Sequence, residues 1–145
     1  DKTAVLEVSA DENLINAHRN LLKDDELIVV QAVAQPDRFS GGLRLKIQQV
    51  WDIAAARCRF GKFLRVAVNG TAPAVATLVR EFPPKRELTD QGELVRGLPV
   101  RLALQRAGAQ CELQLDDRAL FFPTDAALAS WTAQAHERRA EIVFD

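Results

Sequence analysis

The side chains that most often do chemistry are few in this sequence and lie far apart along it. Two histidines, His18 and His136, and two cysteines, Cys58 and Cys111, match no zinc-ligand spacing. The sequence also contains no Gly-rich phosphate loop, nucleophile elbow or HExxH motif. We therefore predict no catalytic residue, no metal site and no cofactor in this chain.

Two pairs of adjacent carboxylates, Asp24-Asp25 and Asp116-Asp117, are the remaining candidates for acid–base catalysis. Both pairs fall in expected turns, where Asp is favoured because its side chain hydrogen-bonds the local backbone. His18 shares a helical face with Leu14 and Leu21, which is typical of a packed or half-buried histidine. Turns and packing explain these residues better than catalysis does.

Binding is better supported, and the first candidate surface is basic. Arg44 and Lys46 project from the polar side of an expected strand, beside a loop that carries Arg38 and Phe39. Cations next to an aromatic ring are what the phosphates and bases of single-stranded nucleic acid require. The alternative is that Arg44 and Lys46 only solubilise an exposed sheet face.

A basic segment follows in the middle of the chain. The sequence has a net charge of −1, from 19 basic and 20 acidic residues, yet residues 54–86 hold seven basic residues and one acidic residue. Arg57 and Arg59 lie at the start of this segment and extend the candidate nucleic-acid surface. The same segment could instead be a solvated connector or a surface for an acidic protein.

The C-terminal residues suit protein binding. Acidic residues, Glu141 and Asp145, flank the apolar residues 142–144 in an expected strand. Val143, Phe144 and Asp145 could therefore join a partner's sheet edge or place an aromatic ring in a partner's pocket. In the alternative interpretation this is an internal strand whose Ile142 and Phe144 face the core.

Length and composition limit the class of protein. With 145 residues, 48% of them hydrophobic and 27% charged, the chain suits one ordinary domain or two small ones and is not disordered. No apolar run approaches the roughly 18 residues of a membrane span. The two separated cysteines indicate reduced thiols in the cytosol. Because the sequence lacks an initiator Met, we expect a piece of a longer polypeptide.

Hydrophobic periodicity predicts two units, with a boundary within residues 54–62, where the alternation stops. In the first unit, Ser9 and Glu12 have capping-box spacing for a helix that runs to about Leu22. The phase of the last strand slips, which predicts a β-bulge at Gln48-Gln49. The expected strands are residues 4–8, residues 27–34 (buried on both faces) and a strand that starts at Leu43.

The second unit is predicted to have the order β-α-β-β-β-α-β with helices on one face, so the fold class is α+β. Thr71 is expected to cap its first helix, and Thr124 or Asp125 its second. A polar connection is expected to lead to Gly97. The expected strands are residues 63–68, a hairpin from Leu98 to Leu115, residues 119–122 and residues 140–144.

Three stretches of the first unit resemble the OB-fold region of the α subunit of bacterial replicative DNA polymerase III. They are residues 21–31 (LLKDDELIVVQ), 37–45 (DRFSGGLRL) and 50–53 (VWDI), of which FSGGLR is the most specific. The ending EIVFD also resembles that subunit's extreme C-terminus. The clear resemblance covers about residues 1 to 57.

The resemblance implies that residues 1–56 are the C-terminal part of an OB-fold domain and residues 57–145 an α+β domain of the τ-binding type. In the family, the OB domain binds single-stranded template, and the terminal peptide contributes to contacts with the τ subunit of the clamp loader or the sliding clamp. The nucleotidyltransferase chemistry of the parent polymerase, with its two Mg²⁺ ions, would precede Asp1. A bacterial, cytoplasmic location follows.

A complete OB barrel has five strands, and we expect the first two to be missing because Asp1 leads directly into what resembles the third. An open sheet edge recruits another chain, so we expect a homodimer or swapped contact through residues 1–53. The leading hypothesis is a non-catalytic region that binds τ and assists binding of single-stranded DNA. The alternative is a pure protein-interaction module that does not bind DNA.

Overall fold

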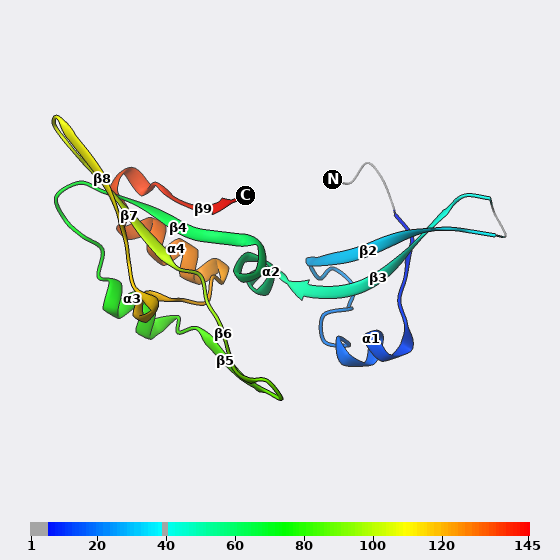
Figure 1. Ribbon diagram of the computed structural model, residues 1–145. Coiled ribbons are helices and arrows are strands. Elements are labelled where there is room, and N and C mark those ends of the chain that lie inside the picture. The colour runs from blue at the N-terminus through cyan, green and yellow to red at the C-terminus, as the bar shows by residue number, and fades with distance from the viewer. Residues whose placement is uncertain (1–5, 39–40) are drawn as a thin grey trace. The chain divides into compact units, whose positions relative to one another are not determined.

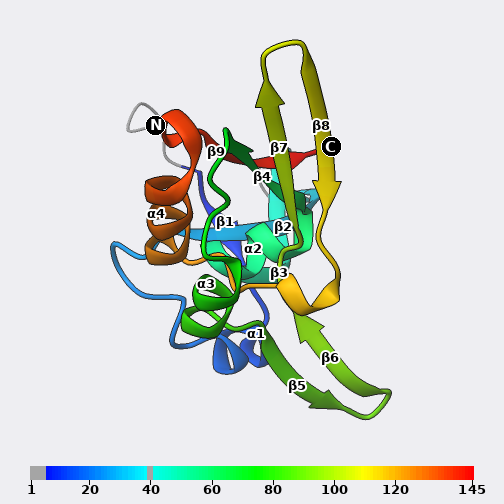
Figure 2. The same cartoon turned by 90° about the vertical axis from the view of Figure 1, so that its left-hand side faces the viewer.

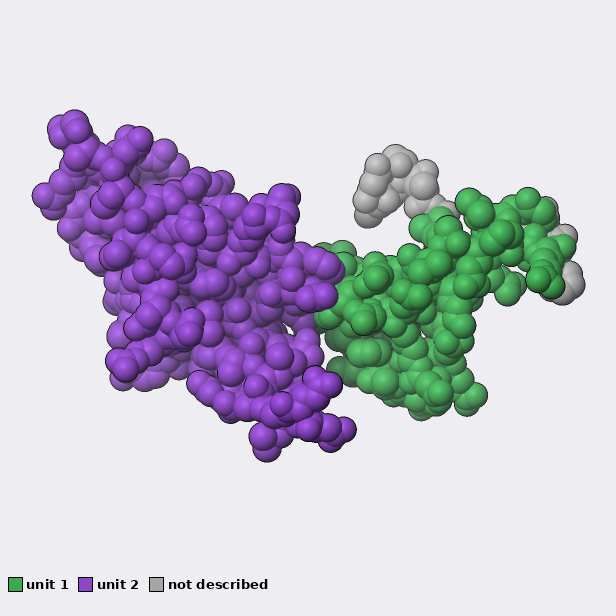
Figure 3. Space-filling view, viewed as in Figure 1, with its two compact units in different colours: residues 1–53 green, residues 54–145 purple. Residues whose placement is uncertain are grey.

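The computed structural model describes residues 6–38 and 41–145. It divides the chain into two compact units, residues 1–53 and residues 54–145 (Figure 3). Both units combine helices with strands, which confirms the predicted α+β class.

An open three-stranded sheet forms the first unit (Figure 1). The central strand β3 pairs in parallel with β1 and antiparallel with β2, and the short helix α1 connects β1 to β2. The described strands form no closed barrel, which is consistent with an incomplete OB-like fold. The bounds are β1 Val8–Ser9, α1 Glu12–Ala17, β2 Ile28–Pro36 and β3 Leu43–Asp52.

The capping box predicted at Ser9 is wrong. Ser9 lies in β1, where its hydroxyl donates to the carbonyl of Leu45 at 3.1 Å. Asp11 is the N-cap of α1 and makes no side-chain cap bond, and the helix ends after six residues rather than at Leu22. Pairing of β1 with β3 therefore overrides the local capping signal.

The strands that flank α1 also differ from prediction. Of the expected strand at residues 4–8, only Val8 lies in β1, and residues 4 and 5 are outside the described residues. The strand predicted to be buried on both faces is half-buried or exposed along its length, and Leu27 beside it is 72% exposed. A doubly buried strand needs a covering layer on each face, and the described part of this unit offers one short helix.

The β-bulge predicted in β3 is confirmed. Gln31 of β2 faces Gln49, while the next residue faces Ile47, so Gln48 is the extra residue of β3. Ile47 and Val50 are both buried, at 5% and 4% exposure. Without an extra residue, positions three apart on a strand point to opposite faces, so the bulge lets both side chains reach the same apolar side.

The second unit is built on a four-stranded sheet in the order β8-β7-β4-β9, in which β4 and β7 are parallel and the other pairs antiparallel (Figure 2). The helix α2 leads into β4, and a separate hairpin, β5–β6, precedes β7. The bounds are α2 Ile53–Phe60, β4 Gly61–Val68, α3 Val75–Glu81, β5 Lys85–Thr89, β6 Gly92–Arg96, β7 Val100–Arg106, β8 Ala109–Gln114, α4 Asp125–Gln134 and β9 Ala140–Phe144.

Helices α3 and α4 pack on one face of this sheet, as predicted. Leu78 of α3 and Trp131 of α4 contribute to one core with strand residues such as Leu64 and Val100, and all four are at most 1% exposed. The ring of Phe121 lies 5.4 Å from that of Trp131. Burial of these large side chains is the main stabilisation of the unit.

Helix capping in the second unit is confirmed at one of the two predicted positions. The Thr124 hydroxyl accepts a hydrogen bond from the Ala127 amide at 3.1 Å and caps α4. Thr71 does not cap α3, because the helix begins at Val75 and its N-cap is Ala74. Pro73, which was expected in the first turn of the helix, precedes it.

Three further segments differ from prediction. The start of the basic segment, where a solvated connector was one interpretation, forms the helix α2, in keeping with the helix propensity of its three alanines. The expected polar connection before Gly97 is the hairpin β5–β6, whose strands are joined by Arg86–Glu93 and Arg96–Glu87 ion pairs. The expected strand at residues 119–122 is a 3₁₀ turn, Asp117–Ala119, followed by an isolated bridge between Leu98 and Phe121.

Candidate functional site

The tip of the β2–β3 hairpin carries the first predicted binding residues. Its turn is closed by backbone hydrogen bonds from Asp37 to the Gly42 carbonyl at 2.8 Å and from Gly41 to the Asp37 carbonyl at 3.0 Å. Gly41 has φ +71°, a conformation that glycine adopts without steric cost. Arg38 lies in this turn with an exposed side chain, and Phe39 lies outside the described residues.

Arg44 and Lys46 share one face of β3. Arg44 pairs with Gln35 close to the turn and is exposed, so Arg38 and Arg44 lie at the same end of the hairpin. The Nζ of Lys46 is 3.0 Å from the carboxylate of Asp11, just before α1. This pairing compensates the charge of Lys46 and leaves the two arginines as the better candidates for phosphate contacts.

Arg57 and Arg59 belong to the second unit, on α2. The guanidinium of Arg57 donates to the Pro123 carbonyl at 3.0 Å and pairs with the Asp125 carboxylate at 2.6 Å. Arg57 therefore joins α2 to the start of α4. Arg59 is exposed, with no ion pair among the described residues.

The C-terminal strand β9 lies at an edge of the sheet and, among the strands that the structure describes, pairs only with β4. Ile142 packs against the core, which confirms the internal-strand interpretation for this residue. Val143 is half-buried opposite Phe63, whereas Phe144 is 52% exposed. Asp145 forms an ion pair with Lys62.

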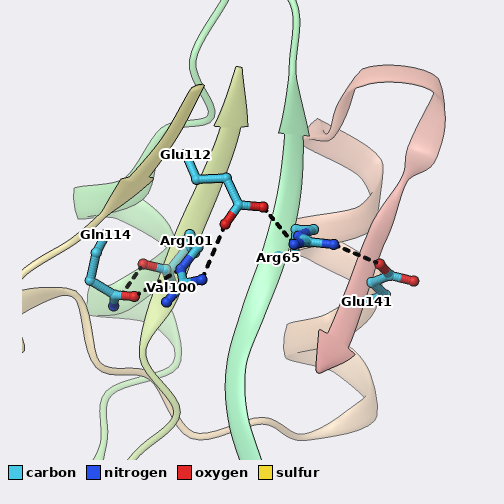
Figure 4. Close-up of polar contacts among 6 residues, drawn as sticks. All are labelled: Arg65, Val100, Arg101, Glu112, Gln114 and Glu141. Atoms are coloured by element: carbon cyan, nitrogen blue, oxygen red, sulfur yellow. Dashed lines mark hydrogen bonds and ion pairs between the residues drawn. The ribbon is translucent and has the colours of Figure 1, made fainter. Parts of the chain in front are cut away.

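A row of ion pairs crosses the face of this sheet that α3 and α4 leave open (Figure 4). Arg65 of β4 pairs with Glu112 of β8 at 2.5 Å and lies 3.9 Å from Glu141 of β9. Arg101 of β7 pairs with Glu112 at 3.1 Å and stacks over the ring of Phe63, 3.7 Å from its centroid. The sequence pattern placed polar residues on one face of each strand, but the partners depend on strand order, which the pattern did not fix.

A hollow of about 700 Å³ lies beside this row of ion pairs, and no pattern of residues along the chain had indicated it. It is lined by the ends of β4, β7 and β8 together with the turn between α4 and β9. Its small apolar residues include Ala67, Ala103 and Ala140. Its charged and titratable residues are Arg65, Arg138, Arg139, His136, Glu112 and Glu141. We call this hollow the sheet groove.

Other kinds of site find little support in the described part of the chain. Within residues 6–38 and 41–145, no three His, Cys, Asp or Glu side chains are grouped so as to hold a metal ion. Cys58 is half-buried and Cys111 is exposed, and no disulfide joins them. None of the helices described is long and apolar enough to cross a membrane.

Comparison with known proteins identifies relatives of one kind. No family model matches the chain. The DNA polymerase III α subunit of Escherichia coli K12 is 26% identical over 148 aligned residues, which cover 100% of this chain and 12% of that protein. The α subunit of Pasteurella multocida is 22% identical over 99% of the chain, and that of Pseudomonas aeruginosa is 33% identical over 48% of it.

The chain spans about 12% of the length of the relatives that match it throughout. The matches extend beyond the first unit, where the resemblance was clear from the residues, into the whole of the second. Along its entire length, this chain is similar to a segment of the bacterial DNA polymerase III α subunit.

Proposed function

We propose that this chain is a non-catalytic part of a replicative polymerase, which binds the τ subunit of the clamp loader and assists binding of single-stranded template. The observation that carries the proposal is the similarity of the whole chain to the DNA polymerase III α subunit. That similarity supports a role in DNA replication in the bacterial cytoplasm. The polymerase reaction and its Mg²⁺ ions are assigned to other parts of the parent protein.

Template binding is assigned to residues 1–56, as the C-terminal part of an OB-fold domain. Arg38, Phe39 and Arg44 are the main candidate contacts, with Lys46, Arg57 and Arg59 as a secondary set. The exposure of Arg38 and Arg44 at one end of a hairpin supports this choice, since OB-fold proteins hold single strands with cations and aromatic rings.

Partner binding is assigned to residues 57–145, with Val143, Phe144 and Asp145 as contacts to τ and, second, to the sliding clamp. Phe144 is half exposed on an edge strand, and an edge strand with a protruding aromatic ring suits strand addition by a partner. The outer edges of β1 and β2 in the first sheet similarly suit pairing with a second copy of the chain.

A pure protein-interaction module is the second candidate function. It is favoured by the engagement of Arg57 with Asp125 and of Lys46 with Asp11, which removes two cations from the proposed DNA surface. In this alternative τ binding is retained and the oligonucleotide does not bind.

A parallel binding experiment separates the two candidates. The purified chain is titrated against τ, the sliding clamp and an oligo-dT strand at several salt concentrations, and its mass in solution is measured. The proposal expects both τ binding and oligonucleotide binding. A plot of the logarithm of the oligonucleotide binding constant against the logarithm of the salt concentration should steepen by roughly 0.7 for each phosphate contacted. No salt-dependent oligonucleotide binding would favour the pure protein-interaction module, and no τ binding would contradict both candidates.

Matched variants test the residues. The double variant Arg38→Glu with Arg44→Glu should abolish oligonucleotide binding while Arg118→Glu, an exposed arginine of the second unit, leaves it unchanged. Phe144→Ala should weaken τ binding without affecting the oligonucleotide. Equal effects of the hairpin variant and Arg118→Glu would remove the hairpin tip from the proposed DNA surface.

A further inference from the structure

The sheet groove has the dimensions and walls of a binding site. Its volume of about 700 Å³ lies within the range of roughly 300–1,000 Å³ found for ligand sites. The half-buried Ala67 and Ala103 face each other on β4 and β7, so the sheet is recessed where larger side chains surround it. Gln105 and Gln110 on the β7–β8 hairpin line one side, and Arg138 and Arg139 line the other.

The unpaired charge around the groove is positive. Each glutamate at its rim already has a cationic partner: Arg65 and Arg101 for Glu112, Arg65 for Glu141 and Arg139 for Glu137. By contrast, Arg138 in the groove and Arg106 in the adjoining hollow have no ion pair or side-chain hydrogen bond among the described residues.

Arg65 adds a second observation at the edge of the groove. Its Nε is buried and has no hydrogen-bond partner within the described chain, although its terminal nitrogens are paired. A buried donor of this kind is costly unless an acceptor reaches it. An acceptor brought by a ligand would satisfy it once the Arg65 side chain turns toward the groove.

The turn that carries Arg138 is strained. Glu137 and Arg138 both have positive φ, at 51° and 55°, and neither is glycine. Such conformations persist only where the surrounding structure enforces them, and they cluster at ligand-binding sites. The strain brings an unpaired guanidinium to the side of an apolar recess.

We infer that the sheet groove binds an extended segment of a partner protein that carries acidic side chains beside small apolar ones. The apolar floor accepts the small side chains, and Arg138 and Arg106 pair with the carboxylates. None of the residues described as lining the groove is a Phe or Trp on which nucleic-acid bases could stack, so a polypeptide fits better than a single-stranded nucleic acid. The inference concerns a different surface from the proposed contacts at Val143, Phe144 and Asp145.

Nuclear magnetic resonance of the full, isotope-labelled chain tests the inference. The probes are a short peptide of alternating Asp and Ala, the same peptide with Lys in place of Asp, and an oligo-dT strand. We expect saturable shifts at the amides of Ala67, Ala103 and Arg138 and at the Nε–H of Arg65, with the acidic peptide alone. Absent shifts at these positions, or stronger competition there by oligo-dT, would overturn the inference.

Two variants at Arg138 distinguish a lost contact with the peptide from misfolding of the chain. Arg138→Glu should weaken binding of the acidic peptide by about tenfold or more, because it replaces an attractive contact to a carboxylate with a repulsive one. Arg138→Gly removes the guanidinium and relieves the positive φ, so the peptide should bind more weakly while the thermal midpoint stays equal or rises. Arg118→Glu is the matched control, and an equal loss in that variant would contradict the inference.

Failure of peptide binding in the groove can be distinguished from failure of the proposed τ binding. Loss of τ binding in Phe144→Ala with intact peptide binding in the groove would support both assignments at separate surfaces. Normal τ binding by a chain that fails to bind the acidic peptide would overturn the groove inference and leave the proposed function standing.

Discussion

Trp131 is fully buried, and its indole Nε1 has no hydrogen-bond partner among the described residues. Trp131→Ala should therefore lower the free energy of unfolding by about 3–5 kcal/mol, the usual cost of deleting a buried large aromatic side chain. Trp131→Phe loses no hydrogen bond and removes an unsatisfied donor, so its cost should stay below about 1.5 kcal/mol. Urea denaturation followed by circular dichroism measures both, and an equal loss of unfolding free energy in the two variants would contradict this ranking.

Arg57 and Arg59 are two residues apart on α2 but have different surroundings. Arg57→Ala should destabilise the second unit by about 1 kcal/mol, because it removes the bonds to the Pro123 carbonyl and to the exposed carboxylate of Asp125. Arg59→Ala should leave stability unchanged. Thermal unfolding of both variants checks this, and equal midpoints would mean that the Arg57 contacts contribute nothing measurable.

At the residue scale, a capping residue could be predicted from the sequence where its hydroxyl had no hydrogen-bond acceptor from a distant part of the chain. Thr124 caps α4 as its sequence indicated, since its hydroxyl has the Ala127 amide within reach. Ser9 has equally good capping spacing, yet its hydroxyl bonds to Leu45, which is distant in sequence. Such a partner is visible only once the strands are paired.

The junction between α2 and β4 depends on Gly61. A Cβ added there would lie 2.5 Å from the Arg57 carbonyl oxygen and 3.0 Å from side-chain atoms of Leu98 and Ile142. Gly61→Ala should therefore destabilise the second unit by about 1–3 kcal/mol, because a backbone atom must move. Gly70→Ala is the control for a glycine in open space, with φ +85°, and should cost about 1 kcal/mol through backbone strain alone. Denaturant unfolding measures both losses of unfolding free energy. A smaller loss for Gly61→Ala than for Gly70→Ala would contradict the proposed crowding at Gly61.

The bulge in β3 predicts the effect of a single-residue deletion. Removing Gln48 would make the β2–β3 ladder regular, but Ile47 or Val50 would then turn away from the buried face. Hydrogen exchange should therefore show loss of protection across β2 and β3, with the second unit unchanged. Deletion of Gln91 is the control, because this residue lies in the β5–β6 turn, outside both larger sheets. It should leave the protection of β2 and β3 unchanged. Retained protection in the Gln48 deletion would show that the register is set by other contacts.

Elements with clear periodicity were predictable, and those held by cross-strand charge pairs were not. The strand β9 has the predicted bounds because the apolar residues Ala140, Ile142 and Phe144 recur at the two-residue spacing of a strand. The β5–β6 hairpin has few apolar residues, and its Arg86–Glu93 and Arg96–Glu87 pairs can be recognised only from its register. The sheet groove depends on strand order for the same reason.

At the scale of the molecule, burial is concentrated in the second unit. In the described part of the first unit only Ile47 and Val50 are buried hydrophobic residues, whereas the second unit has a continuous core. A fragment of residues 54–145 should therefore unfold cooperatively near the midpoint of the full chain, and residues 1–53 alone should not. Calorimetry of the two fragments checks this, and a cooperative transition in residues 1–53 alone would contradict it.

The central claim is that this chain binds replication partners, and its most direct test is the affinity for τ. Titration calorimetry of the full chain against purified τ should give saturable binding that Phe144→Ala weakens and Arg118→Glu does not. No heat of binding under conditions where the chain is folded, or identical affinities for all three proteins, would contradict the proposed role.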